Sequence, residues 1–164
     1  MPPSQLCAKR NSLDNDTRTV YHHDMKQKEW NTTGNCVYIT WYHLIWSTKY
    51  RYPVLVGAVA ERVEQILVEV CKTRSYEMKA HEVMPDHVHL LVSIPPAEAV
   101  CNAVKVLKGT SARLTFLSHP QLKKQLWGGH LWNPAYYVGT AGEVSQAIIQ
   151  RYIESQKQHA FTDH

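Results

Sequence analysis

The chain has 164 residues, of which 44% are hydrophobic and 20% charged, enough for one domain with a buried core and too few for several large domains. It contains no run of about 18 apolar residues, and its first residues carry no apolar leader, so neither a membrane span nor secretion is supported, and we expect a soluble cytoplasmic protein. The four cysteines form no C-x-x-C pair, which argues against a zinc knuckle or a disulfide framework.

The charge is mildly positive, with a formal net charge of +4 at pH 7. Its distribution is uneven, because no acidic residue lies between Glu98 and Glu143 while several lysines and an arginine do. This stretch is compatible with a surface that binds nucleic acid phosphates, and equally with an ordinary solvated helix face.

Residues 1–35 are polar and lack a helical or strand period, which predicts a flexible N-terminal extension. Residues 36–164 then form one domain, starting with a strand over 36–46 (CVYITWYHLIW) that is apolar on both faces. A helix follows over 57–73, then two extended runs over 76–84 and 87–93 joined by a tight turn at Pro85 and Asp86.

The second half of the domain predicts a helix over 100–114, a loop over 118–134, a strand over 135–140 and a final helix over 143–158. The order is β-α-β-β-α-β plus one C-terminal helix, which predicts an α+β, ferredoxin-like sandwich: an antiparallel sheet with helices on one face. Because the first strand is apolar on both faces, we expect a second subunit to cover the free face of the sheet.

Two pairs of residues could carry chemistry. His87 and His89 alternate with apolar residues on an extended run, so both imidazoles point to one face and could share a metal ion. Tyr152 and Gln156 are four residues apart on the final helix and share a face. The ordinary alternatives are surface histidines and a tyrosine that packs by its ring.

Five segments resemble one family in family order: YHLIWSTKYRYPVL (42–55), EVMPDHVHLLVS (82–93), LKGTSAR (107–113), LWGGHLWNPAYYVGT (126–140) and QRYIESQ (150–156). The family is the single-tyrosine HUH transposases of the insertion-sequence 200/605 group, prokaryotic enzymes that act on single-stranded DNA. The resemblance covers residues 36–158, and residues 1–35 exceed what the family usually carries.

The resemblance implies a role for each of the four residues. His87 and His89 would be metal ligands, Gln156 the third protein ligand, and Tyr152 on the C-terminal helix the nucleophile that forms a covalent 5'-phosphotyrosine. Two imidazoles and an amide leave positions open for phosphate oxygens and water, which fits Mg²⁺ or Mn²⁺ better than a closed zinc site.

The resemblance also implies the partners: single-stranded DNA with subterminal hairpins, and a homodimer in which one subunit supplies the histidines and the other the tyrosine helix. Gly139 and Gly142, which precede that helix, would let it swing to either subunit. Candidate DNA contacts are the basic and aromatic residues of the first loop and the polar residues of the second helix: Lys49, Tyr50, Arg51, Tyr52, Lys105, Lys108, Ser111 and Arg113.

Two other functions remain open. One is a non-catalytic, ferredoxin-like protein that binds single-stranded nucleic acid through aromatic residues on its sheet. The other is a small metallohydrolase built on the H-x-H pair, which would need more carboxylate ligands than these segments offer. The joint presence of His87, His89, Tyr152 and Gln156 favours the transposase.

Overall fold

The computed structural model describes residues 30–142, 149–151 and 153. By its internal contacts the chain divides into two units, residues 1–37 and 38–164. No helix in the described part of the chain is long and apolar enough to cross a membrane.

A short hairpin lies at the boundary of these units. Strands β1 (Asn31–Thr33) and β2 (Cys36–Tyr38) pair with each other, and Gly34 between them adopts a left-handed φ of 49°. The prediction of one strand over 36–46 is therefore wrong, and the predicted flexible extension includes a strand at residues 31–33, while residues 1–29 lie outside the described residues.

The reason for the break lies in the neighbouring strand. The ladder that pairs β3 (Trp41–Ser47) with β5 (His87–Ser93) ends at Trp41 and Ser93. Pro95 and Pro96 follow soon after and have no N–H to extend that ladder. Residues 36–38 consequently pair with β1 instead.

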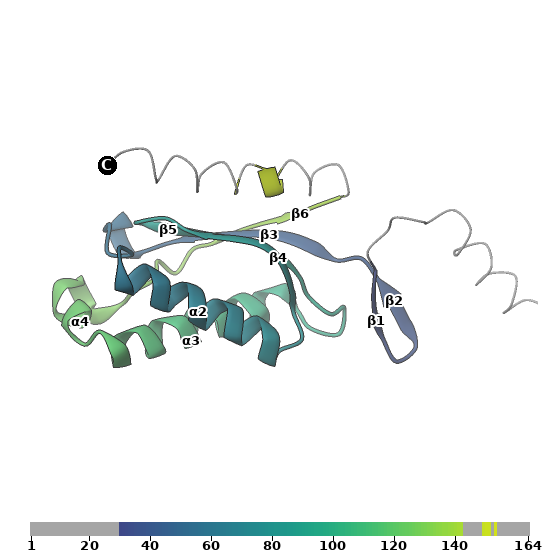
Figure 1. Ribbon diagram of the computed structural model, residues 1–164, viewed down its shortest axis with the longest axis horizontal. Helices are drawn as coiled ribbons and strands as arrows, with labels where there is room; N and C mark the ends of the chain where they lie inside the picture. Colours follow the sequence, from purple (N-terminus) through teal and green to yellow (C-terminus); the bar gives the residue numbers. More distant parts are fainter. Residues whose placement is uncertain (1–29, 143–148, 152, 154–164) are drawn as a thin grey trace, which may run out of the picture. The chain divides into compact units, whose positions relative to one another are not determined.

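The main unit is built on a four-stranded sheet in the order β4-β5-β3-β6, with β4 at Glu77–Val83 and β6 at Tyr137–Thr140. Every neighbouring pair is antiparallel. Helices α2 (Ala58–Thr73) and α3 (Val100–Ser118) cover one face of this sheet (Figure 1). This is the ferredoxin-like β-α-β-β-α-β sandwich that the sequence predicts.

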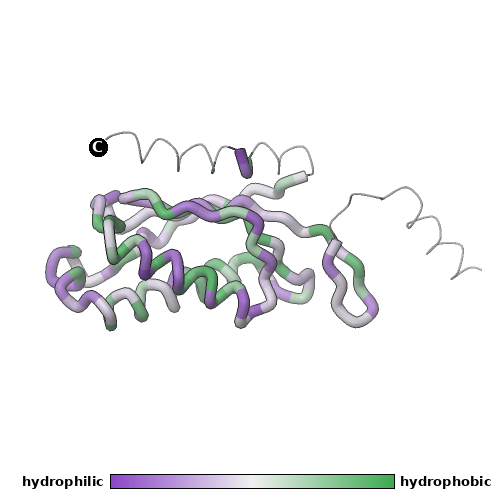
Figure 2. Tube along the Cα trace, viewed as in Figure 1, coloured by the Kyte–Doolittle hydropathy of each residue, from purple (hydrophilic) through white to green (hydrophobic). Residues whose placement is uncertain are grey.

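The main core lies between the sheet and the two helices. On β3 and β5 the residues of even number point inward, and Figure 2 shows apolar positions recurring along both helices and the central strands. The innermost residues come from all of these elements: Leu44, Trp46, Val63, Ile66, Leu67, Val88, Leu90, Val92, Val104 and Leu107. This core fixes β5, and therefore fixes which residues of β5 face outward.

A smaller apolar cluster lies on the opposite face of the sheet. Trp41, Ala80 and Leu91 pack there with Ala141 and with Ile153, a described residue of the predicted final helix. Ile153 is 1% exposed, so its side chain is fully covered. The second apolar face of the first strand, which the sequence analysis assigned to another subunit, is thus covered at Trp41 by the same chain.

The predicted loop over 118–134 contains a short helix, α4 (Gln121–Gln125), and a 3-10 turn, η2 (Trp127–Gly129). Leu122 and Leu126 are buried and anchor this region to the core side of the domain. A second 3-10 turn, η1 (Lys49–Arg51), follows β3.

Candidate functional site

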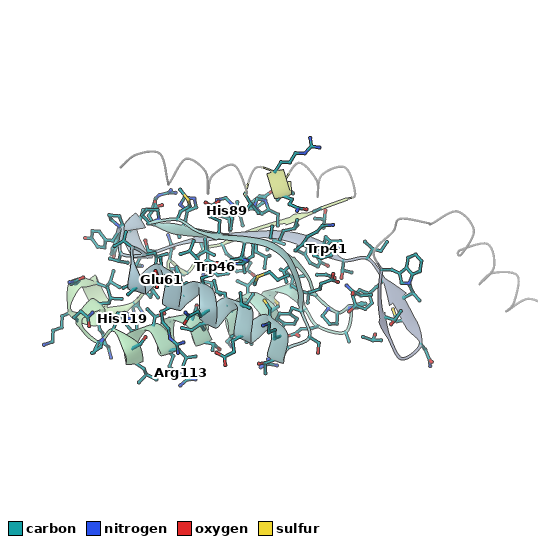
Figure 3. All side chains as sticks on the ribbon, in the orientation of Figure 1. Trp41, Trp46, Glu61, His89, Arg113 and His119 are labelled. Atoms are coloured by element: carbon teal, nitrogen blue, oxygen red, sulfur yellow. The ribbon has the colours of Figure 1, made fainter. Side chains whose placement is uncertain are left out.

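His87 and His89 lie side by side on the outer face of β5. Val88 and Leu90, which alternate with them, are fully buried toward the helices, so the core turns both imidazoles away from it. The two ring centroids are 4.9 Å apart. In Figure 3, His89 points to the side of the sheet opposite the helices, while Trp46 lies between the sheet and the helices.

His87 is held by a carboxylate. Its Nδ1 donates a hydrogen bond of 2.5 Å to Oδ1 of Asp86, and Oδ2 of Asp86 accepts one of 2.8 Å from Nε of Arg51. Burial alone would raise the pKa of Asp86, but the hydrogen bond from His87 and the charges of His87 and Arg51 bring that pKa below its ordinary value. Asp86 is therefore a stable anion that orients His87.

His89 is held by another histidine. Its Nδ1 lies 3.1 Å from Nε2 of His43 on β3, and the two rings are stacked with centroids 5.4 Å apart. Burial, followed by the charges of His87 and His43, lowers the pKa of His89 to about 4. His89 is therefore neutral at pH 7, the state in which imidazole binds metal. Across the strand pair, the buried Glu82 on β4 lies opposite His89.

The two histidines border an open pocket of about 550 Å³. Its walls come from the end of β3, the turn η1, strand β5 and the segment before β6. The lining residues are Ile45, Trp46, Ser47, Arg51, His87, His89, Asn133, Ala135, Tyr136 and Tyr137. His87 is half-buried beside this opening, whereas His89 is buried at its edge.

The histidine pair fits a divalent cation. In metal sites a ligating histidine usually donates its second ring N–H to a carboxylate or another acceptor, and Asp86 supplies that acceptor for His87. Within residues 30–142, 149–151 and 153, no three His, Cys, Asp or Glu side chains form a group that could hold a metal ion. Further ligands would have to come from other residues, water or the substrate. Tyr152 and Gln156 lie outside the described residues, so their roles stay predictions.

The turn η1 presents aromatic and basic side chains next to this pocket. Tyr50 and Tyr52 are exposed and meet edge to face at 6.1 Å, and Nζ of Lys49 lies 4.8 Å from the centre of the Tyr50 ring. Tyr50 and Arg51 adopt left-handed φ values of 57° and 55°. This backbone turns Arg51 toward Asp86, so one predicted DNA contact also supports a predicted metal ligand.

The predicted DNA contacts on α3 differ from one another. Lys105 and Arg113 are exposed, but they lie on the helical layer, and Figure 3 shows Arg113 on the opposite side of the sheet from His89. The structure does not bring them to the histidines.

Two further residues of α3 need a correction. Ser111 is fully buried and accepts a hydrogen bond from Nε1 of Trp132, so its hydroxyl is not exposed to DNA. Nζ of Lys108 donates to the carbonyl oxygens of residues 133, 134 and 135 at 2.7, 3.0 and 3.3 Å. Burial lowers the pKa of Lys108. Lys108 thus holds a wall of the pocket.

Gly139 also differs from its expected role as part of a hinge. It lies inside β6, paired with His43 of β3, and is held by the ladder. A Cβ at Gly139 would lie 2.8 Å from the hydroxyl oxygen of Tyr137, so the glycine provides space for the Tyr137 ring. Gly142 follows the strand and is the remaining candidate for flexibility at this junction.

Sequence reasoning missed His43, Asp86 and the structural role of Lys108. The available signal for His43 was its position in the strand alternation: it precedes the buried Leu44, as His89 precedes the buried Leu90, and so points to the outer face of the sheet. Alternation alone does not give the strand register, and register is what brings His43 to His89.

The chain is similar to several known transposases. The model of the family "Transposase IS200 like" matches residues 36–156. The chain is 53% identical over 120 residues to the ISDra2 transposase TnpA of Deinococcus radiodurans, covering 73% of this chain and 86% of that protein. It is 32% identical over 126 residues to the transposase for insertion sequence element IS200 of Salmonella typhimurium, covering 77% and 80%.

Two solved structures are similar. A crystal structure of a Deinococcus radiodurans protein described as a transposase has 48% identity and a TM-score of 0.65, covering 77% of this chain and 97% of that one. A REP-associated tyrosine transposase bound to a REP hairpin has 15% identity and a TM-score of 0.54, covering 75% and 70%, and supports the fold. The chain therefore belongs to the IS200-like transposases of the insertion-sequence 200/605 group, whose activity is DNA transposition.

Proposed function

We propose that the chain cleaves and rejoins single-stranded DNA at the ends of an insertion sequence through a covalent tyrosine intermediate. The observation that carries the proposal is the pair His87 and His89, which lie next to each other on an open pocket, each with Nδ1 in a hydrogen bond. This arrangement suits a divalent cation that neutralises a phosphate oxygen, which cleavage of DNA needs and binding alone does not.

Tyr152 is the proposed nucleophile. Its phenolic oxygen attacks the scissile phosphorus, a new O–P bond forms, and the 3' oxygen leaves with a proton as a free hydroxyl. The product is a 5'-phosphotyrosine, which keeps the ester energy, and attack by another 3'-hydroxyl rejoins the strand and frees Tyr152. A divalent cation, Mg²⁺ or Mn²⁺, would neutralise a phosphate oxygen when held by His87, His89 and Gln156.

The proposed DNA partner is single-stranded and carries subterminal hairpins. The similar REP-associated transposase is described as bound to a REP hairpin, which supports hairpin binding in this chain. Tyr50 and Tyr52 are exposed on either side of Arg51, which lines the pocket, and are suited to stack on unpaired bases, with Lys49 close to Tyr50 for the DNA backbone. Lys105 and Arg113 would contact DNA from the helical layer.

The direct test is formation of a covalent adduct. The full chain is incubated with end-labelled single-stranded DNA from the element's ends and Mn²⁺, then denatured and separated by electrophoresis. We expect a labelled protein band that disappears with Tyr152→Phe and with EDTA. Tyr38→Phe, the same change at a tyrosine of β2 that does not line the pocket, is the matched control and should still form the band. DNA binding without any adduct would favour the non-catalytic binding protein.

The proposal includes a homodimer whose active sites combine histidines of one subunit with the tyrosine of the other. Strand β6 offers an edge for association, because its Tyr137 and Val138 are 57% and 38% exposed. Ile149 and Ile153 pack on the sheet of their own chain, so shared sites require the same contacts to form across the dimer.

Mixing two inactive variants tests this arrangement. One chain carries His87→Ala and His89→Ala, and the other carries Tyr152→Phe. If sites are shared, the heterodimer keeps one complete site and the adduct returns in part. If sites form within one chain, both sites of the heterodimer are incomplete and no adduct forms. Differently tagged chains show whether subunits have exchanged.

A further inference from the structure

His43 lies on the outer face of β3, close to the proposed metal ligands. In the β3–β5 register, Ile45 is paired with His89 and His43 with Leu91, so His43 is a diagonal neighbour of His89. The two imidazoles bridge this diagonal, with Nε2 of His43 at 3.1 Å from Nδ1 of His89 and the planes 23° apart. The contact is a directed hydrogen bond between rings held by adjacent strands.

The position of His43 is fixed on its other side by Tyr137. The two rings meet edge to face with centroids 6.2 Å apart. Tyr137 can lie there because the next residue on that face of β6 is Gly139, where any Cβ would approach the Tyr137 hydroxyl to 2.8 Å. His43 is therefore held between His89 and an aromatic ring, which limits rotation of its imidazole.

The direction of the hydrogen bond decides which nitrogen of His89 can bind metal. A neutral imidazole carries one proton, so the pair shares one hydrogen along the line from Nδ1 of His89 to Nε2 of His43. If that hydrogen belongs to His89, its Nε2 has the lone pair that a cation needs. If it belongs to His43, the proton of His89 is on Nε2, and that nitrogen cannot be a ligand.

The group that accepts the hydrogen bond from Nδ1 differs between His87 and His89, the two proposed metal ligands. His87 has a carboxylate, Asp86, which can only accept, so the tautomer of His87 is fixed by charge. His89 is 6% exposed and has an imidazole instead.

We propose that His43 is a positioning residue of the metal site: it accepts the hydrogen bond from Nδ1 of His89 and so holds His89 with Nε2 as the metal-binding atom. The inference rests on the proposed function for the existence of the metal site. His43 is not itself a third ligand in this arrangement, because its Nε2 accepts the hydrogen bond from His89. In the described part of the chain, no three His, Cys, Asp or Glu side chains form a group that could hold a metal ion.

The first measurement is the tautomer of His89 in metal-free protein, from the ¹⁵N shifts of its ring in long-range ¹H–¹⁵N spectra. His43→Gln keeps an acceptor, its amide oxygen, near the position of Nε2, whereas His43→Leu fills similar space without one. His81→Leu is the matched control, because His81 is another half-buried strand histidine and pairs with Glu64 on α2. Thermal unfolding establishes that each variant is folded.

We expect wild type, His43→Gln and His81→Leu to keep His89 protonated on Nδ1, and His43→Leu to shift it toward the Nε2-protonated form. The second measurement is Mn²⁺ affinity without DNA, from the electron paramagnetic resonance signal of free Mn²⁺. Loss of the acceptor in His43→Leu should weaken binding by about 10-fold or more, as expected for a removed second-sphere partner, and His43→Gln should restore most of it.

The outcomes separate this inference from the proposed function. An unchanged tautomer of His89 in His43→Leu, or Mn²⁺ affinity equal to wild type, would overturn the role of His43. If the wild-type chain binds no Mn²⁺, or if His87→Ala binds it as well as wild type does, the proposed metal site is wrong. The tautomer measured without metal then still decides whether His43 sets the state of His89.

Discussion

Replacing Ser111 with alanine should destabilise the protein, although the sequence pattern predicted this serine as a DNA contact. Ser111 is fully buried on α3, and its Oγ accepts a 3.0 Å hydrogen bond from Nε1 of Trp132, which is 7% exposed. Trp132 also packs edge to face on Trp46 at 6.0 Å, so the indole cannot easily turn to reach water.

The magnitude follows from the unpaired indole N–H. A buried donor left without an acceptor costs about 1–3 kcal/mol. The helix preference of alanine over serine returns roughly 0.5 kcal/mol, and the hydrogen bond from Ser111 to the carbonyl of Leu107 is within the helix and adds little. We therefore expect Ser111→Ala to lower the free energy of unfolding by about 1–2 kcal/mol.

Urea unfolding followed by circular dichroism measures this loss as a lower midpoint with an unchanged slope. Ser118→Ala is the matched control, because Ser118 makes the same kind of hydrogen bond, to the carbonyl of Leu114, but is exposed. Repeating Ser111→Ala in a Trp132→Phe background, where the N–H is absent, should remove most of the cost. Equal effects of Ser111→Ala and Ser118→Ala, or the same cost in the Trp132→Phe background, would refute the reasoning.

Three other substitutions test the surroundings of the site. Lys108→Met removes the donor to three carbonyls and should cost about 1.5–3 kcal/mol, with faster hydrogen exchange in residues 132–136; weaker DNA binding at unchanged stability would contradict this. Leu91→Ala removes packing against Ile153 and should cost about 2–4 kcal/mol in urea unfolding, whereas a loss well below 1 kcal/mol would indicate that this contact is weak. Gly139→Ala should displace the ring of Tyr137, visible as shifted ring signals in NMR spectra, and unchanged signals would contradict the 2.8 Å approach.

The order of elements could be predicted because each long element has a clear period. Val63, Ile66, Leu67 and Val70 recur at helical spacing and are all buried on α2. The alternation around His89 likewise predicted which face of β5 holds the histidines. Such patterns depend only on which side of an element meets the core, which is local information.

What could not be predicted depends on neighbours distant in sequence. The strand-like composition is continuous from Cys36 to Trp46, and only the end of the β5 ladder at Ser93 divides it. Lys108 looks like any basic residue on a helix, and it becomes half-buried because the segment around Asn133 folds over it. The pattern around Ser111 gave no sign that Trp132 would donate to it.

The outer face of β5 connects the proposed ligands with the anchor of the final helix. His87, His89 and Leu91 are spaced two residues apart and point to the same side, so about 7 Å separates each from the next. Leu91 packs against Ile153, while His89 borders the pocket. One strand, fixed from behind by the main core, therefore sets the distance between the docking position of that helix and the proposed metal. Changes that loosen the core behind β5 should disturb both at once, whereas changes at His43 should act first on His89, to which its imidazole is hydrogen-bonded.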